Sequence, residues 1–104
     1  MAAVQWDRLL ETCYRRGGTD LLLTPGSSPM IRLADAWHDL QAPILEREEV
    51  EVAAREKIAE PDGKADGYAY SDICHSRAGK FRVTAFGYPQ AKLLLVTRYP
   101  DQAV

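Results

Sequence analysis

Cysteine is scarce in this chain, and long apolar runs are missing. The two cysteines among the 104 residues, Cys13 and Cys74, lie far apart and form no Cys-x-x-Cys pair. This spacing argues against a disulfide scaffold and against a structural zinc site, so a reducing compartment is expected. Charges interrupt the apolar positions of the N-terminal stretch "MAAVQWDRLLETCYRR", and no stretch approaches the ~18 apolar residues of a membrane span. The sequence therefore predicts a cytoplasmic protein that is not inserted in a membrane.

Neither positive nor negative residues are in large excess. The formal net charge is −2, with 27% charged and 46% hydrophobic residues. This composition is that of an ordinary folded domain, and it gives no electrostatic reason to expect a nucleic acid or an acidic membrane surface as partner. The length fits a single domain over residues 1–104 with one hydrophobic core.

The motifs of nucleotide and metal chemistry are absent from the sequence. It contains no Gly-x-x-x-x-Gly-Lys-Ser/Thr loop, no Gly-x-Gly-x-x-Gly after a strand and no His-Glu-x-x-His. Cys74, His75 and the nearby Asp72 could be drawn as a metal or nucleophile cluster. Neighbouring strand residues point to opposite faces, however, and no spaced set of further ligands exists. We therefore expect no enzymatic activity, no metal and no cofactor for this chain.

Two stretches have the apolar periodicity of amphipathic helices. The first has a stripe at i, i+3, i+4 and i+7 that consists of Trp6, Leu9, Leu10 and Cys13. Two glycines follow it and end the helix. The second stretch, "LEREEVEVAAREKIAE", is acidic at its start and basic towards its end, as the helix dipole favours. We expect helices near residues 6–16 and 46–59.

The remaining apolar runs are short and bounded by turn residues, as strands are. "TDLLLT" and "PMIRL" are joined by the turn "TPGSS", and a third short strand is expected around Trp37. Three more strands are expected in "YAYSDI", "KFRVTAF" and "KLLLVTRY", with Phe81, Val83 and Ala85 on one face and Arg82 on the other. The short turns predict an α+β fold with a mainly antiparallel sheet of five or six strands and two main helices packed against it.

Three arginines interrupt these strand-like runs, namely Arg32, Arg82 and Arg98. An arginine between apolar strand neighbours directs its guanidinium at solvent, at an acidic partner or at a phosphate. For any single arginine, an exposed face or a local ion pair is the commoner explanation.

Several segments, taken in order, resemble one known family. The segment "GGTDLLLTPGSSPMIRLADAW" is similar to the N-terminal signature of the type IV pilus retraction (twitching motility) ATPases and their type II secretion relatives. "PILEREEVEVAAREKI" corresponds to the helix that follows in that family, and "GKFRVTAF" and "VTRYP" resemble two of its later strands. The resemblance covers nearly the whole chain.

The resemblance implies a PAS-like N-terminal domain that precedes a RecA-like motor domain, which is absent from residues 1–104. In the family the motor binds ATP and Mg²⁺. The N-terminal domain serves subunit packing and the transmission of nucleotide-driven motion in a hexamer. The implied partner is a motor domain in cis or in a neighbouring subunit of a homo-oligomer, without nucleic acid. The implied location is the cytoplasm, including the inner face of the cytoplasmic membrane.

The resemblance also implies roles for the three arginines. Through "KFRV", Arg82 occupies the position of a family arginine that approaches the nucleotide phosphates. When the chain is aligned with the family from Phe81 without gaps, a second such arginine of the family falls on Thr97. Arg98 is therefore one residue away from that position and is expected on the opposite face of the strand. Arg98 is the second candidate for phosphate contact, and Arg32 is the candidate for subunit packing. The alternative is a stand-alone PAS-like module that binds a small ligand or a partner protein.

Overall fold

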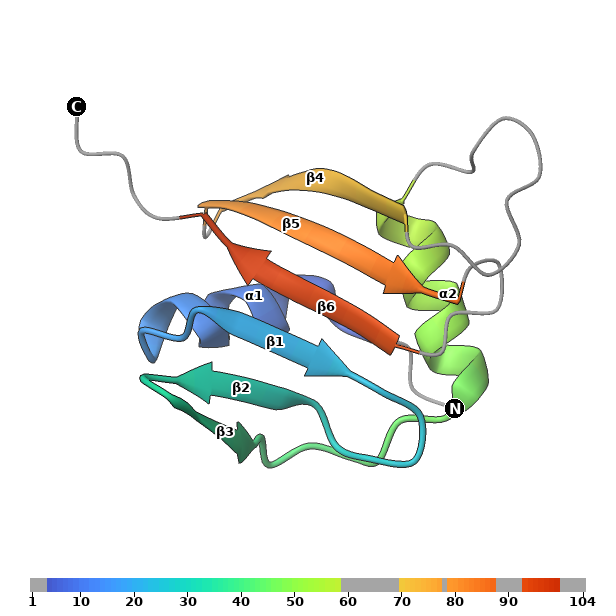
Figure 1. Ribbon diagram of the computed structural model, residues 1–104, viewed down its shortest axis with the longest axis horizontal. Helices are drawn as coiled ribbons and strands as arrows, with labels where there is room; N and C mark the ends of the chain where they lie inside the picture. The colour runs from blue at the N-terminus through green and yellow to red at the C-terminus, as the bar shows by residue number, and fades with distance from the viewer. Residues whose placement is uncertain (1–3, 59–69, 78, 88–92, 100–104) are drawn as a thin grey trace.

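A six-stranded antiparallel sheet forms one layer of the molecule, and two helices form the other (Figure 1). The structure, a computed structural model, describes residues 4–58, 70–77, 79–87 and 93–99. The elements along the chain are α1 (Trp6–Arg15), β1 (Asp20–Leu23), β2 (Met30–Leu33), β3 (Ala36–Asp39), α2 (Arg47–Lys57), β4 (Tyr70–Ser76), β5 (Gly79–Phe86) and β6 (Leu93–Arg98). The strand order is β3-β2-β1-β6-β5-β4. The predicted α+β class, with a sheet of this kind and two helices, is confirmed.

Helix α1 forms where the apolar stripe predicts it, but one member of the stripe is not part of the core. Trp6, Leu10 and Cys13 are buried against the sheet, whereas Leu9 is only partly buried. At the end of the helix the amides of residues 17 and 18 donate to the carbonyls of Tyr14 and Cys13. Gly17 has a φ of 72°, a left-handed conformation that glycine adopts at little cost.

Helix α2 begins with a capping box. The Glu46 side chain accepts from a backbone amide of the first turn, and the Glu46 amide donates to Glu49 Oε1 at 3.0 Å. Val50, Ala53 and Ala54 face the sheet and are buried. The last residue of the second predicted helix, at position 59, lies outside the described residues. Neither helix of the described chain is long and apolar enough to cross a membrane.

The sheet has one face covered by helices and one open face. In Figure 1 both helices lie behind the sheet, and the open face is towards the viewer. On β5, Phe81, Val83 and Ala85 are buried beneath the helices, as the alternation predicts. The other strands place Leu21, Leu23, Ile31, Leu94 and Val96 in the same core. The alternate residues of these strands therefore form the open face.

The first and last strands of the chain lie side by side in the middle of the sheet. β1 pairs with β2 on one side and with β6 on the other, and Asp20 lies opposite Arg32 and Thr97. β6 also pairs with β5, where Arg82 lies opposite Thr97. Because residues opposite each other in a sheet share a face, this register assembles one continuous row across the open face.

Candidate functional site

The row at one end of the open face contains two of the three predicted arginines. From β2 to β5 it consists of Arg32, Asp20, Thr97 and Arg82. Each residue comes from a different strand, so the side chains of neighbouring strands are held one sheet spacing apart, about 4.8 Å. The sheet therefore presents these polar groups side by side on the open face.

Arg82 is held in place by neighbours on β4 and just beyond β6. Its guanidinium donates to Ser71 Oγ at 3.1 Å and to Tyr99 Oη at 2.8 Å. The Tyr99 ring also lies near two cations, with its centroid 5.8 Å from the guanidinium carbon of Arg82 and 4.8 Å from Lys80 Nζ. The Tyr99 amide continues the ladder by donating to the Lys80 carbonyl at 3.0 Å. Two positive side chains thus flank one aromatic ring.

The electrostatics of this cluster suit an anion. Arg82 is exposed, and no carboxylate in the described part of the chain forms an ion pair with it or with Lys80. Hydrogen bonds from a guanidinium to phosphate or carboxylate oxygens are stronger than those between neutral groups. Ser71 and Tyr99 occupy two of the donor positions of Arg82 and fix its plane. The remaining N–H groups can donate to an anionic group of a partner or ligand.

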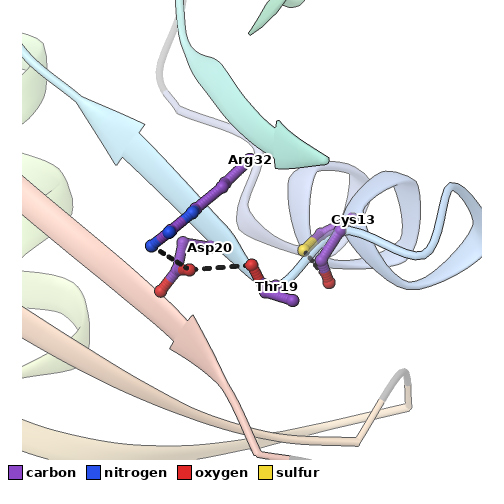
Figure 2. A network of polar contacts seen from close by, with 5 residues as sticks. Cys13, Thr19, Asp20 and Arg32 are labelled. Carbon is purple, nitrogen blue, oxygen red and sulfur yellow. Dashed lines mark hydrogen bonds and ion pairs between the residues drawn. The ribbon is translucent and has the colours of Figure 1, made fainter. Parts of the chain in front are cut away.

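Arg32 has a carboxylate partner within the domain. Its Nη1 lies 3.9 Å from Asp20 Oδ2, and that carboxylate also accepts a hydrogen bond from Thr19 Oγ1 at 2.9 Å. Figure 2 shows the side chains of Arg32 and Thr19 directed at Asp20. The side chain of Arg32 is 45% exposed, so the pair contributes little to the free energy of folding. Arg32 remains accessible at the surface.

Arg98 lies on the opposite face from Arg82. It pairs with buried Phe81 in the sheet register, and its guanidinium carbon is 4.5 Å from the centroid of the Tyr14 ring. Its Nη1 is also 3.5 Å from the carbonyl oxygen of Gly18. These contacts connect the end of β6 to the end of α1. The structure therefore does not bring Arg82 and Arg98 together, in agreement with the one-residue displacement in the sequence.

The two cysteines, Cys13 on α1 and Cys74 on β4, are buried in the core and are free thiols. Cys13 Sγ donates to the carbonyl of Gly18 at 3.3 Å (Figure 2). Burial raises the pKa of the Cys13 thiol to about 11, although the positive charge of Arg98 opposes this shift. The thiol is therefore protonated and unreactive at neutral pH.

The sheet separates His75 from Cys74 and Asp72, the other two residues that could have formed a metal or nucleophile cluster. Cys74 lies opposite Phe81 and His75 lies opposite Lys80, so the two side chains are on different faces. No group of three His, Cys, Asp or Glu side chains in the described ranges is arranged to hold a metal ion.

Sequence reasoning missed Lys80, Ser71 and Tyr99 as neighbours of Arg82. Lys80 could have been found, because it lies two residues before Arg82 and strand alternation places both on one face. Ser71 and Tyr99 depend on the register of β4 and β6 against β5. That register is not visible in the sequence.

Comparison with known proteins shows a likeness at the level of fold. No family model and no curated protein matches the sequence. Among solved structures, the chain is similar to the crystal structure of the pilus retraction motor PilT with bound ADP, with a TM-score of 0.73 and 16% identity. The similarity covers 95% of this chain and 30% of the PilT chain. The chain thus has the fold of a region that makes up about a third of a pilus retraction motor.

Proposed function

We propose that this chain is an interaction and regulatory domain of the kind found N-terminal to the motor of type IV pilus retraction or type II secretion ATPases. It packs between subunits of a hexamer and transmits nucleotide-driven motion. The observation that carries this proposal is the similarity of fold to PilT over 95% of the chain, together with the order of the sequence segments that resemble that family.

In this proposal the partner is a RecA-like motor domain, in cis or in a neighbouring subunit, and the motor binds ATP and Mg²⁺. The domain works in the cytoplasm, at the inner face of the membrane where a pilus or secretion motor acts. Arg82 meets the phosphates of the nucleotide bound by the partner. Its exposure on the open face and its lack of a carboxylate partner among the described residues support that role. Arg32, accessible at the same end of the sheet, contributes to subunit packing.

Arg98 has a different part in this arrangement. Its contacts with Tyr14 and Gly18 connect the two layers of the domain, and they lie on the face away from Arg82. In the proposed hexamer Arg98 therefore maintains the position of α1 against the sheet, and a phosphate contact falls to Arg82 alone.

The isolated chain is expected neither to hydrolyse ATP nor to bind it tightly. The backbone cradle and metal-binding carboxylates of a phosphate loop are absent from the sequence, and two exposed cations, Arg82 and Lys80, are not enough to hold Mg-ATP tightly. Isothermal titration calorimetry with Mg-ATP should show no saturable heat in the micromolar range. Saturable micromolar binding would show that this chain has a nucleotide site of its own, and would contradict the assignment of ATP to a separate motor.

The reading frame beyond codon 104 provides the most direct test of the proposal. A phosphate loop within the next domain length is the expected result, because the proposed function needs a motor. A stop codon, with no separate motor domain that binds the chain, would favour the alternative of a stand-alone PAS-like module. If a stop codon follows, size-exclusion chromatography of the chain mixed with a candidate motor domain tests for a separately encoded motor. Co-elution of the two would show that such a motor binds the chain.

A further inference from the structure

A groove of about 640 Å³ lies on the helix side of the molecule, between α1 and the segment that connects β3 to α2. It exists because the helix layer does not extend over the whole sheet. His38 on β3 lies opposite buried Ile31 and so faces the helix side, yet all four β3 residues are exposed. In Figure 1 β3 lies at the lower edge of the sheet, away from both helices.

The floor of this groove is apolar. Leu9 and Val4 pack partly against the core and also line the groove, as do the buried side chains of Leu40 and Leu45. Leu9 belongs to the apolar stripe of α1 but is only partly buried in the core. The apolar stripe of α1 is therefore wider than the part that the core buries, and its remaining residue, Leu9, lines the groove.

One wall of the groove is a helix surface of suitable length for another helix. The wall is formed by α1 and the residues that cap it, and it includes Gln5, Leu9, Thr12 and Arg16, which follow each other at intervals of three or four residues. Such a row extends over about 16 Å, or three turns. Rows of this spacing are the surfaces into which the side chains of a second helix pack.

The charges around the groove are divided between its two walls. Arg8 and Arg16 lie on the α1 wall, eight residues and therefore about 12 Å apart along the helix axis. Asp39 and Glu49 lie on the opposite wall. Of these four groups, none forms an ion pair within the described residues. A complementary occupant carries acidic residues along one flank and basic residues along the other.

We propose that this groove binds an amphipathic helix of a partner protein. The apolar stripe of the partner's helix fills the space above Leu9 and Leu40. Acidic side chains of that helix, two turns apart, contact Arg8 and Arg16, and its basic side chains contact Asp39 and Glu49. The bound helix becomes a third helix of the layer and covers the region beneath β3. This site is on the other side of the sheet from Arg82, so the proposal is independent of the proposed motor function.

Binding of synthetic helical peptides to the isolated chain tests this proposal. The first peptide, of about 18 residues, has leucine at i, i+3, i+4 and i+7 with glutamate on one flank and lysine on the other. The second has lysine on both flanks. Fluorescence anisotropy should show saturable micromolar binding of the first peptide and at least fivefold weaker binding of the second. Amide NMR shifts should be centred on Leu9 and Thr12 and should leave Thr84 on the open face unchanged.

Charge reversal on the protein provides the matched comparison. The double substitution Arg8→Glu/Arg16→Glu should lower the affinity for the first peptide at least fivefold. The same variant should bind the second peptide more tightly than the unaltered chain does. Arg15→Glu/Arg47→Glu changes the net charge equally at two exposed positions outside the groove, and should change binding less than twofold. The difference in affinity between the two peptides should become smaller in about 0.5 M salt, because salt screens the charges around the groove.

Three results would overturn the proposal. The first is that neither peptide shows saturable binding up to millimolar concentration. The second is that the control substitutions weaken binding as much as the groove substitutions, which indicates general electrostatic attraction. The third is that the NMR shifts are centred on the open face. The comparison of the two peptides on the unaltered chain keeps the test valid if a variant does not fold.

Discussion

Replacing Arg82 with alanine is expected to lower ATP turnover at least tenfold in a protein in which this domain is joined to its motor domain. The free energy of unfolding of the isolated domain should change by no more than about 0.5 kcal/mol, the usual range for surface sites. The two effects differ because Arg82 is exposed and its partners inside the domain are two neutral hydroxyl groups. Its positive charge is available to stabilise the charge that develops on a transferred phosphate.

The controls for Arg82 are other arginines of the same chain. Arg55→Ala, on the exposed side of α2, removes the same charge far from the row and should leave turnover unchanged. Arg98→Ala should lower the stability of the isolated domain more than Arg82→Ala does, because Arg98 connects β6 to α1. Steady-state ATPase assays and urea denaturation measure both quantities. If Arg82→Ala unfolds the isolated domain, Arg82 is a structural residue and its assignment to the phosphates is wrong.

Substituting Gly18 with alanine is expected to destabilise the domain by about 1–3 kcal/mol, as overpacking of a core does. A Cβ at this position would lie 2.7 Å from both Cδ1 and Cγ1 of Ile31 and 3.2 Å from Cys13 Sγ. Ile31 and Cys13 are fully buried, so neither can move into solvent. The backbone between α1 and β1 must therefore shift, or the packing of both elements must loosen.

Urea denaturation of the single and double variants tests this explanation. Ile31→Ala removes both Cδ1 and Cγ1, so the Gly18→Ala/Ile31→Ala variant should lose less stability than the sum of the two single losses. Gly17→Ala is a matched control, because a Cβ added at Gly17 would meet no atom within 4 Å, although the residue has a φ of 72°. It should cost about 1 kcal/mol through backbone strain alone. Additive losses for Gly18 and Ile31 would contradict a direct steric conflict.

The sequence determined which segments form elements and which side of each strand is apolar. The stripe of Trp6, Leu10 and Cys13 and the alternation around Arg82 were both readable, because helix and strand periodicity is a local property of the backbone. The one-residue displacement of Arg98 relative to Thr97 was readable for the same reason. Its consequence, that Arg82 and Arg98 occupy opposite faces, agrees with the observed register.

Only the tertiary structure decided which elements are neighbours. The pairing of β1 with β6, the contact of Arg98 with the carbonyl of Gly18 and the hydrogen bond from Arg82 to Tyr99 join residues distant in sequence. The partial exposure of Leu9 likewise depends on how far the helix layer extends over the sheet. Such contacts are fixed by the packing of one shared core, in which the fit of all elements is decided together, and no local pattern in the chain encodes that fit.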